Sequence, residues 1–178
     1  PEFSIATPEV VAHVVPNHWC AQPYFWRDAQ EEHFSEDQLR WLRSELRRKP
    51  QLPHILVTHS PVFGLPPEQT GQAEPLHPPH QSFTETILRL ADEHPQLRCV
   101  LGGHNHMNSR IERQGVQYVT ASAFVETPFE AKLIEVSPTR LAMRTLRLGT
   151  TEPPGEYCAE RAFVQGRAVD REFDLALR

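Results

Sequence analysis

The sequence has little cysteine, with only Cys20, Cys99 and Cys158 among 178 residues. The number is odd, the three are far apart, and no Cys-x-x-Cys pair occurs. This pattern argues against a disulfide framework and against a thiolate zinc site. We therefore expect free thiols that are buried or half-buried.

Long apolar runs are also absent. No run approaches the roughly 18 residues that a helix needs to cross a bilayer, and residues 1–20 lack the basic-then-apolar layout of a signal peptide. We expect no membrane partner, and the absence of a visible signal favours a cytoplasmic location.

The chain opens on Pro1 without an initiator Met, so we expect it to be part of a longer protein whose true N-terminus is missing.

The sequence lacks a strong excess of either charge. It has 18 Lys and Arg against 23 Asp and Glu, a formal net charge of −5. Such a balance gives no general attraction to nucleic acid or to anionic lipid. A nucleic-acid partner is not indicated, and a phosphate-bearing ligand would need a local site.

Proline and histidine are abundant instead, with 17 and 10 residues. Histidine is the commonest metal ligand and titrates near neutral pH. The positions of the histidines are therefore where we look for function.

Apolar periodicity predicts an α/β order of elements. Capping boxes of Ser35 with Gln38 and of Ser82 with Glu85 predict the starts of two helices. The first helix covers 36–49 and the second ends at His94. The predicted strands are 9–15, 55–58, 99–101, 117–121, 131–136 and 141–148, with a last strand and a short helix at 162–164 and 173–177.

We expect one domain over residues 1–149, followed by a C-terminal extension over 150–178. Residues 60–80 form a long Pro-rich loop inside the domain. Loops of this length are uncommon in compact domains and are usually functional or disordered.

Three histidines follow two of the predicted buried strands. His59 ends the first of these strands, and His104 and His106 follow the second. If the segment is extended, His104 and His106 point the same way, because side chains alternate along a strand. Gly102 and Gly103 allow a tight turn and a close backbone approach. In open α/β sheets ligands bind at the carboxyl ends of strands, so these histidines are candidate metal ligands.

Two of these segments resemble signature blocks of the calcineurin-like metallophosphoesterases. They are Thr-His-Ser-Pro at 58–61 and Gly-His-Asn-His at 103–106, and the Gln-Leu-Arg-Trp-Leu segment at 38–42 is similar to a helix that often precedes them. The resemblance covers about residues 10–147. It implies the C-terminal part of a double β-sandwich flanked by helices, with two divalent or mixed-valence metal ions (Mn, Fe or Zn). By the resemblance, His59 and His104 ligate one metal and His106 the other.

The family's earlier blocks, Asp-x-His, Gly-Asp-x-x-Asp and Gly-Asn-His-Asp, are absent before His59. Without a bridging carboxylate, two cations at about 3.5–4 Å repel each other with little to offset the repulsion. The chain therefore resembles the C-terminal half of a catalytic domain, with the N-terminal half as its missing partner.

Four further residues are weaker candidates. Asn17 and His18 echo the Gly-Asn-His-Asp block, with Asn17 as a metal ligand and His18 as the acid that protonates the leaving oxygen, although Pro and Trp replace its first and last residues. A loop following a strand is the alternative interpretation of that segment. Asn105 could touch substrate, and Arg110 could hold a phosphate or be a surface strand residue.

Three functions remain open. The first is a metal-dependent hydrolase of phosphoric esters, diesters or monoesters, in the complete protein. The second is a catalytically silent half-domain that binds one metal or none and forms a homodimer through an exposed sheet edge. The third is a zinc hydrolase with three histidine ligands, similar to carbonic anhydrase in ligand count only.

Overall fold

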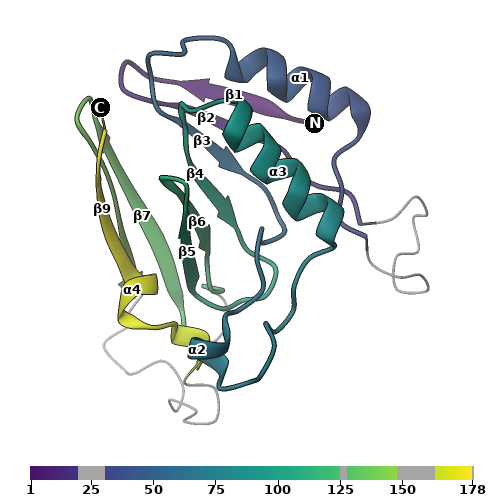
Figure 1. Cartoon of the computed structure of the whole chain (residues 1–178). Helices are drawn as coiled ribbons and strands as arrows, with labels where there is room; N and C mark the ends of the chain where they lie inside the picture. The colour runs from purple at the N-terminus through teal and green to yellow at the C-terminus, as the bar shows by residue number, and fades with distance from the viewer. Residues whose placement is uncertain (20–30, 125–127, 148–162, 178) are drawn as a thin grey trace.

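The computed structural model describes residues 1–19, 31–124, 128–147 and 163–177. Two long helices cover one face of a six-stranded sheet, and a three-stranded sheet lies on the opposite face (Figure 1). The predicted α/β fold with flanking helices is confirmed. In these residues no helix is long and apolar enough to cross a membrane.

The larger sheet has the strand order β1-β2-β3-β4-β6-β5. β2, β3, β4 and β6 pair in parallel, whereas β1 and β5 are antiparallel edge strands. The carboxyl ends of the parallel strands therefore meet at one edge of the sheet. The strands are β1 (Phe3–Ala6), β2 (Val11–Val14), β3 (His54–Val57), β4 (Leu97–Gly102), β5 (Ser109–Arg113) and β6 (Val116–Thr120).

The smaller sheet is antiparallel, with β7 (Glu130–Ser137), β8 (Arg140–Arg147) and β9 (Glu172–Ala176) in that order. The prediction of a strand and then a helix at this end of the chain is wrong. Residues 163–165 form a 3₁₀ turn, the short helix α4 (Ala168–Arg171) follows, and β9 comes last. Phe173 and Leu175 alternate with more exposed neighbours, a period of two that suits a strand.

Helix α1 (Glu36–Leu46) begins at the predicted capping box. The Ser35 hydroxyl accepts from the Gln38 backbone N–H, and the Gln38 side chain accepts from the Ser35 backbone N–H. The helix ends before residue 49, because Leu46 is its last buried residue and the residues after it are exposed. The helix therefore ends where its buried residues end, at Leu46, and not at Pro50.

Helix α3 (Gln81–Glu93) does not use the predicted capping box of Ser82 and Glu85. Its N-cap is His80, whose ring Nδ1 accepts from the Ser82 backbone N–H. The histidine ring takes the place expected for the serine hydroxyl, so the helix begins before Ser82. The loop at 60–80 also contains one helical turn, α2 (Pro67–Thr70).

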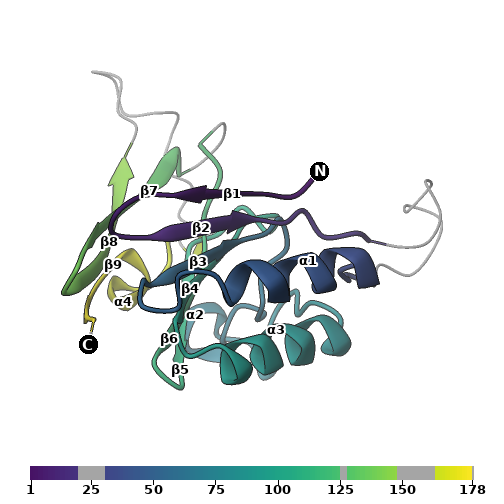
Figure 2. The same cartoon turned by 90° about the horizontal axis from the view of Figure 1, so that it is seen from above.

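Two apolar clusters hold the layers together. The first packs α1 and α3, which lie side by side (Figure 2), against one face of the large sheet through residues such as Leu42, Phe83 and Val100. The second joins the opposite face to the small sheet, and its buried members include Cys99, Leu141 and Met143. Cys99 is a buried free thiol, as predicted, while Cys20 and Cys158 lie outside the described residues.

Candidate metal site at the strand ends

His59 and His104 meet where β3 and β4 end. The His59 Nε2 and His104 Nδ1 atoms are 3.3 Å apart, the ring centroids are 5.2 Å apart, and the planes make an angle of 65°. Both side chains are exposed. The structure thus brings together two of the three histidines that the sequence proposes as metal ligands.

A close backbone approach fixes this pair. A Cβ atom on Gly102 would lie 2.5 Å from the Ser60 carbonyl oxygen and 2.9 Å from Pro61 Cα, so only glycine fits there. The Gly103 N–H then donates to the His59 carbonyl at 2.8 Å. Gly103 itself has room for a side chain, because its nearest neighbour would be the His59 carbonyl oxygen at 3.7 Å.

The segment after β4 is not extended, contrary to the prediction. His104 and His106 both adopt left-handed backbone conformations, with φ of 65° and 57°. The alternation argument for their side chains therefore does not apply. His106 is exposed, and its charge acts on His104.

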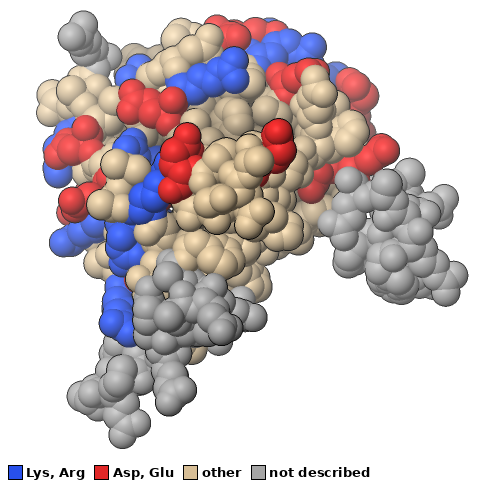
Figure 3. All heavy atoms as spheres, turned by 60° about the horizontal axis from the view of Figure 1, so that its bottom comes forward, with Lys and Arg blue, Asp and Glu red and all other residues tan. Residues whose placement is uncertain are grey.

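The electrostatic surroundings of His104 favour a neutral ring. Partial burial lowers its pKa, the positive charges of His59, His106 and His77 lower it further, and Glu32 opposes them. In Figure 3, which brings the end of the molecule with α2 forward, Lys, Arg, Asp and Glu gather toward the rim while the centre of the view carries few of them. A neutral imidazole keeps a lone pair free for a metal ion.

Two residues that sequence reasoning missed lie at this site. The Trp19 ring packs on His104 with centroids 4.3 Å apart and on His59 at 5.7 Å. Glu32 is buried, and its carboxylate accepts from the His80 backbone N–H at 2.8 Å. Both positions follow from a β-bridge between residues 18 and 33, and no local sequence signal predicts that bridge.

Asn17 holds the turn that carries His59. Its Oδ1 accepts from the Thr58 hydroxyl at 3.2 Å and from the Ser60 N–H at 2.9 Å, and its Nδ2 donates to the Ser60 hydroxyl at 3.0 Å. Two hydrogen bonds occupy both lone pairs of that oxygen. In this geometry Asn17 positions His59, and ligation of a metal would require one of these bonds to be given up.

His18, the candidate leaving-group acid, pairs with His33 across the bridge. Its neighbour Trp19 packs on His59 and His104. Asn105 lies between His104 and His106, and its Nδ2 is buried with no hydrogen-bond partner among the described residues.

Arg110, the other proposed substrate contact, is engaged elsewhere. Its guanidinium donates to the Gln117 side chain at 2.7 Å and to the Val169 carbonyl at 2.5 Å, and it lies over the Phe173 ring. It stands on β5, which β6 separates from β4 in the sheet. These contacts connect Arg110 to the C-terminal segment.

The donor set fits one metal ion better than two. Two nitrogens bound at about 2.0–2.1 Å with tetrahedral geometry lie about 3.3–3.4 Å apart, which matches the separation of the His59 and His104 nitrogens. Among the described residues, no group of three or more His, Cys, Asp or Glu side chains converges on one point. A carboxylate-bridged pair of ions therefore has no complete ligand set in this part of the protein.

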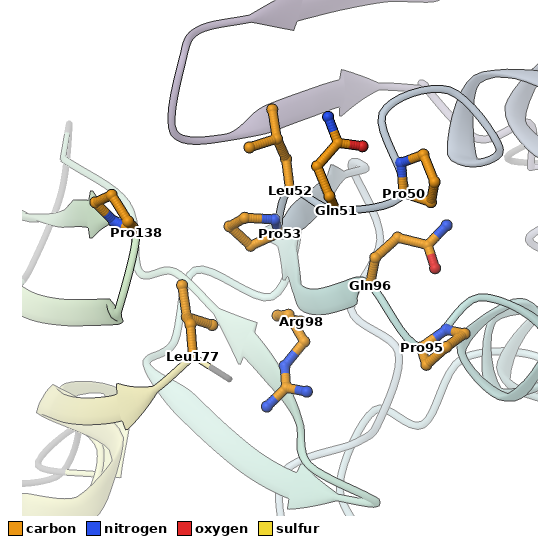
Figure 4. Close-up of a pocket in the computed structure, with 9 residues that line it drawn as sticks. All are labelled: Pro50, Gln51, Leu52, Pro53, Pro95, Gln96, Arg98, Pro138 and Leu177. Atoms are coloured by element: carbon orange, nitrogen blue, oxygen red, sulfur yellow. The ribbon is translucent and has the colours of Figure 1, made fainter.

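Cavities lie on both ends of the sheet. One of about 270 Å³ lies beside the candidate site and is lined by His59, Thr58, Val57, Val14 and other residues. Another of about 300 Å³ lies at the opposite end, between the segments that precede β3 and β4 (Figure 4). The second contains none of the candidate residues.

No protein-family model matches the sequence, and a search of curated proteins finds no match. Among solved structures, the fold is similar to that of a dimetal phosphatase from Danio rerio, with a TM-score of 0.60 and 19% sequence identity. The match covers 81% of this chain and 56% of that chain. The chain therefore shares its fold with this phosphatase and spans little more than half of that chain's length.

Proposed function

We propose that this chain takes part in the metal-dependent hydrolysis of phosphoric esters, as a portion of a larger catalytic domain. The observation that carries the proposal is the 3.3 Å separation of the His59 and His104 nitrogens at the carboxyl ends of two parallel strands. In the proposal these two side chains bind one ion and His106 binds a second. The fold shared with a dimetal phosphatase supports the same chemistry.

The ions would be Mn, Fe or Zn, because imidazole suits these metals better than it suits Mg. When bound, such an ion polarises phosphoryl oxygens and makes water a stronger nucleophile near neutral pH. In the proposal, the carboxylates that a second ion needs come from residues outside this chain.

In the proposal, the chain's own residues orient the two metal-binding side chains. Asn17 and the Gly103 N–H hold the backbone at and beside His59, so the main chain that carries its ring is fixed before a ligand arrives. Trp19 excludes water from one side of the two rings. In the proposal Asn105, which lies between His104 and His106 in the sequence, contacts the phosphoryl group of a diester or monoester, and its buried Nδ2 must be exposed for it to donate a hydrogen bond there.

The test measures metal content and hydrolysis of a chromogenic phosphate diester and monoester by the chain loaded with Mn²⁺ or Zn²⁺. We expect His59→Gln and His104→Gln each to remove the same ion, and any hydrolysis to fall with it. His80→Gln is the matched control, because His80 is also exposed. Full metal content in the first two variants would contradict the proposal.

A second candidate function is the silent half-domain that dimerises through a sheet edge. One observation favours it: β1 is an edge strand without charge or proline, and Phe3 and Ile5 are 49% and 56% exposed. Such an edge invites pairing with another strand. A dimer mass that returns to the monomer mass in Ile5→Lys, together with no hydrolysis under any metal, would favour this candidate.

A further inference from the structure

A second pair of histidines is adjacent in sequence to two residues of the candidate site. His18 precedes Trp19, and His33 follows Glu32. His18 and His33 face each other across an antiparallel bridge, in which the His18 N–H donates to the His33 carbonyl at 2.8 Å and the reverse bond is 3.0 Å. The ring centroids are 5.4 Å apart with 30° between the planes. Directly opposite residues of an antiparallel pair have Cβ atoms about 4.5–5.5 Å apart, so both rings leave the backbone on one side and close together.

The hydrogen bonding of His33 presents one ring nitrogen outward. Its Nδ1 lies 2.9 Å from the Glu31 carbonyl oxygen. A carbonyl oxygen only accepts, so Nδ1 carries the proton and Nε2 carries the lone pair. Histidine ligands of metals are commonly held in this way, with the remote ring N–H donating to a backbone carbonyl or carboxylate.

The pair is also accessible. His18 is exposed and His33 is half-buried, so an ion with its remaining water ligands can reach both rings. The separation of the two ring centroids, 5.4 Å, is close to the 5.2 Å found between His59 and His104. Imidazole pairs favour late first-row divalent ions such as Zn²⁺ and Cu²⁺.

We propose that His18 and His33 form a two-histidine site for a late first-row divalent ion, separate from the ion at His59 and His104. An ion at this site ties together the segments that present Trp19 and Glu32, because each of these residues follows or precedes one of its ligands. Its role is to hold the Trp19 ring over His59 and His104. This assigns His18 a metal-binding role in place of leaving-group acid, and it does not depend on the proposed hydrolase activity.

The test uses Zn²⁺ and a background variant with His59→Gln, His104→Gln and His106→Gln, in which the first site is removed. Zn²⁺ binding is measured by competition with a chromophoric chelator. We expect one Zn²⁺ per chain, with affinity reduced at least roughly tenfold by His18→Gln or by His33→Gln, since even the loss of an outer-shell partner costs 10–100-fold. His80→Gln in the same background should leave the affinity unchanged.

A background variant that binds no Zn²⁺, or that keeps its affinity after His33→Gln, would overturn the assignment. Histidine ring ¹⁵N NMR of the unsubstituted chain gives an independent measurement in case a variant does not fold. Zn²⁺ should shift the Nε2 resonance of His33 while its Nδ1 keeps its proton. A His33 Nε2 resonance that Zn²⁺ leaves unchanged would equally contradict the proposal.

Discussion

The backbone of Gly102 lies too close to the turn after β3 for any larger residue. A Cβ there would meet the Ser60 carbonyl oxygen at 2.5 Å, whereas one on Gly103 would have 3.7 Å of clearance. The contact is between two backbones, so no side chain can move aside to relieve it.

We therefore predict that Gly102→Ala destabilises the fold by about 1–3 kcal/mol, the usual cost of overpacking. Gly103→Ala, as the matched control, should cost less than about 0.5 kcal/mol, as for surface substitutions away from special features. Urea unfolding of both variants measures the difference. Equal stabilities would show that the turn can relax away from Gly102.

The buried residues His13 and His54 form a chain of hydrogen bonds toward the opposite end of the sheet. His13 Nε2 lies 2.9 Å from His54 Nδ1, the Ser4 hydroxyl lies 2.8 Å from His13 Nδ1, and His54 Nε2 lies 3.2 Å from the Lys49 carbonyl oxygen. The carbonyl can only accept, so His54 donates to it and His13 donates to His54. Both rings are therefore neutral in this arrangement.

Burial lowers the pKa of His13 from 6.5 to about 4; the neighbouring His54 lowers it further, and Glu45 opposes the shift. The unfolded chain thus takes up a proton on this residue at a higher pH than the folded chain does. The stability that His13 contributes is fully present above pH 6.5 and is lost as the pH falls toward 4. The loss amounts to about 3 kcal/mol.

The measurement is the free energy of unfolding between pH 7 and pH 4, for the chain and for His13→Gln. We expect the variant to start lower and to show a shallower slope, since it lacks the titrating ring. Identical slopes would mean that the pKa of His13 is the same in the folded and the unfolded chain.

At the level of single residues, the sequence predicts the contact of His59 with His104 because each follows a buried strand, and parallel strands align their carboxyl ends. It does not predict Trp19 or Glu32. Their positions depend on a bridge between residues 18 and 33, which is tertiary structure with no periodic pattern to reveal it.

Among the elements, α1 is the one whose start is defined most fully by local sequence. Besides the capping box with Ser35, the Gln38 side chain donates to the Pro16 carbonyl at 2.9 Å, which joins the helix to the end of β2. Gln38 is accordingly buried although it is polar.

We predict that Ser35→Ala destabilises the chain by about 1 kcal/mol, the usual cost of losing an N-cap. Ser44→Ala, on the exposed face of the same helix, serves as the control and should be neutral or slightly stabilising because alanine is the better helix former. Thermal or urea unfolding separates the two. A loss of the same size at Ser44 would argue against a specific role for the cap.

Local pattern predicts elements well where their apolar residues face the core and poorly elsewhere. β3 and β4 are buried runs, and the sequence places both. β1 is missed because Phe3 and Ile5 are exposed. The prediction of an extended segment at His104 and His106 is wrong, because the turn after Gly102 has a left-handed backbone conformation. The spacing of the two histidines in the sequence does not indicate that conformation.

At the scale of the whole molecule, the described residues form only part of a metal site, because no third His, Cys, Asp or Glu side chain joins the two rings. Two imidazoles meet at the carboxyl ends of β3 and β4, and the match with the dimetal phosphatase covers 56% of that chain. The family's acidic blocks are absent before His59, which predicts that further ligands lie outside this chain, and this stays a prediction.

The central claim is that His59 and His104 hold the same metal ion, and anomalous diffraction at the zinc edge from crystals grown with Zn²⁺ tests it most directly. We predict an anomalous peak between the two rings, about 2.0–2.1 Å from His59 Nε2 and from His104 Nδ1, whether or not other histidines also bind Zn²⁺. If no peak lies between the two rings and they keep their 3.3 Å contact without an ion, the claim is contradicted, whatever Zn²⁺ does at His18 and His33.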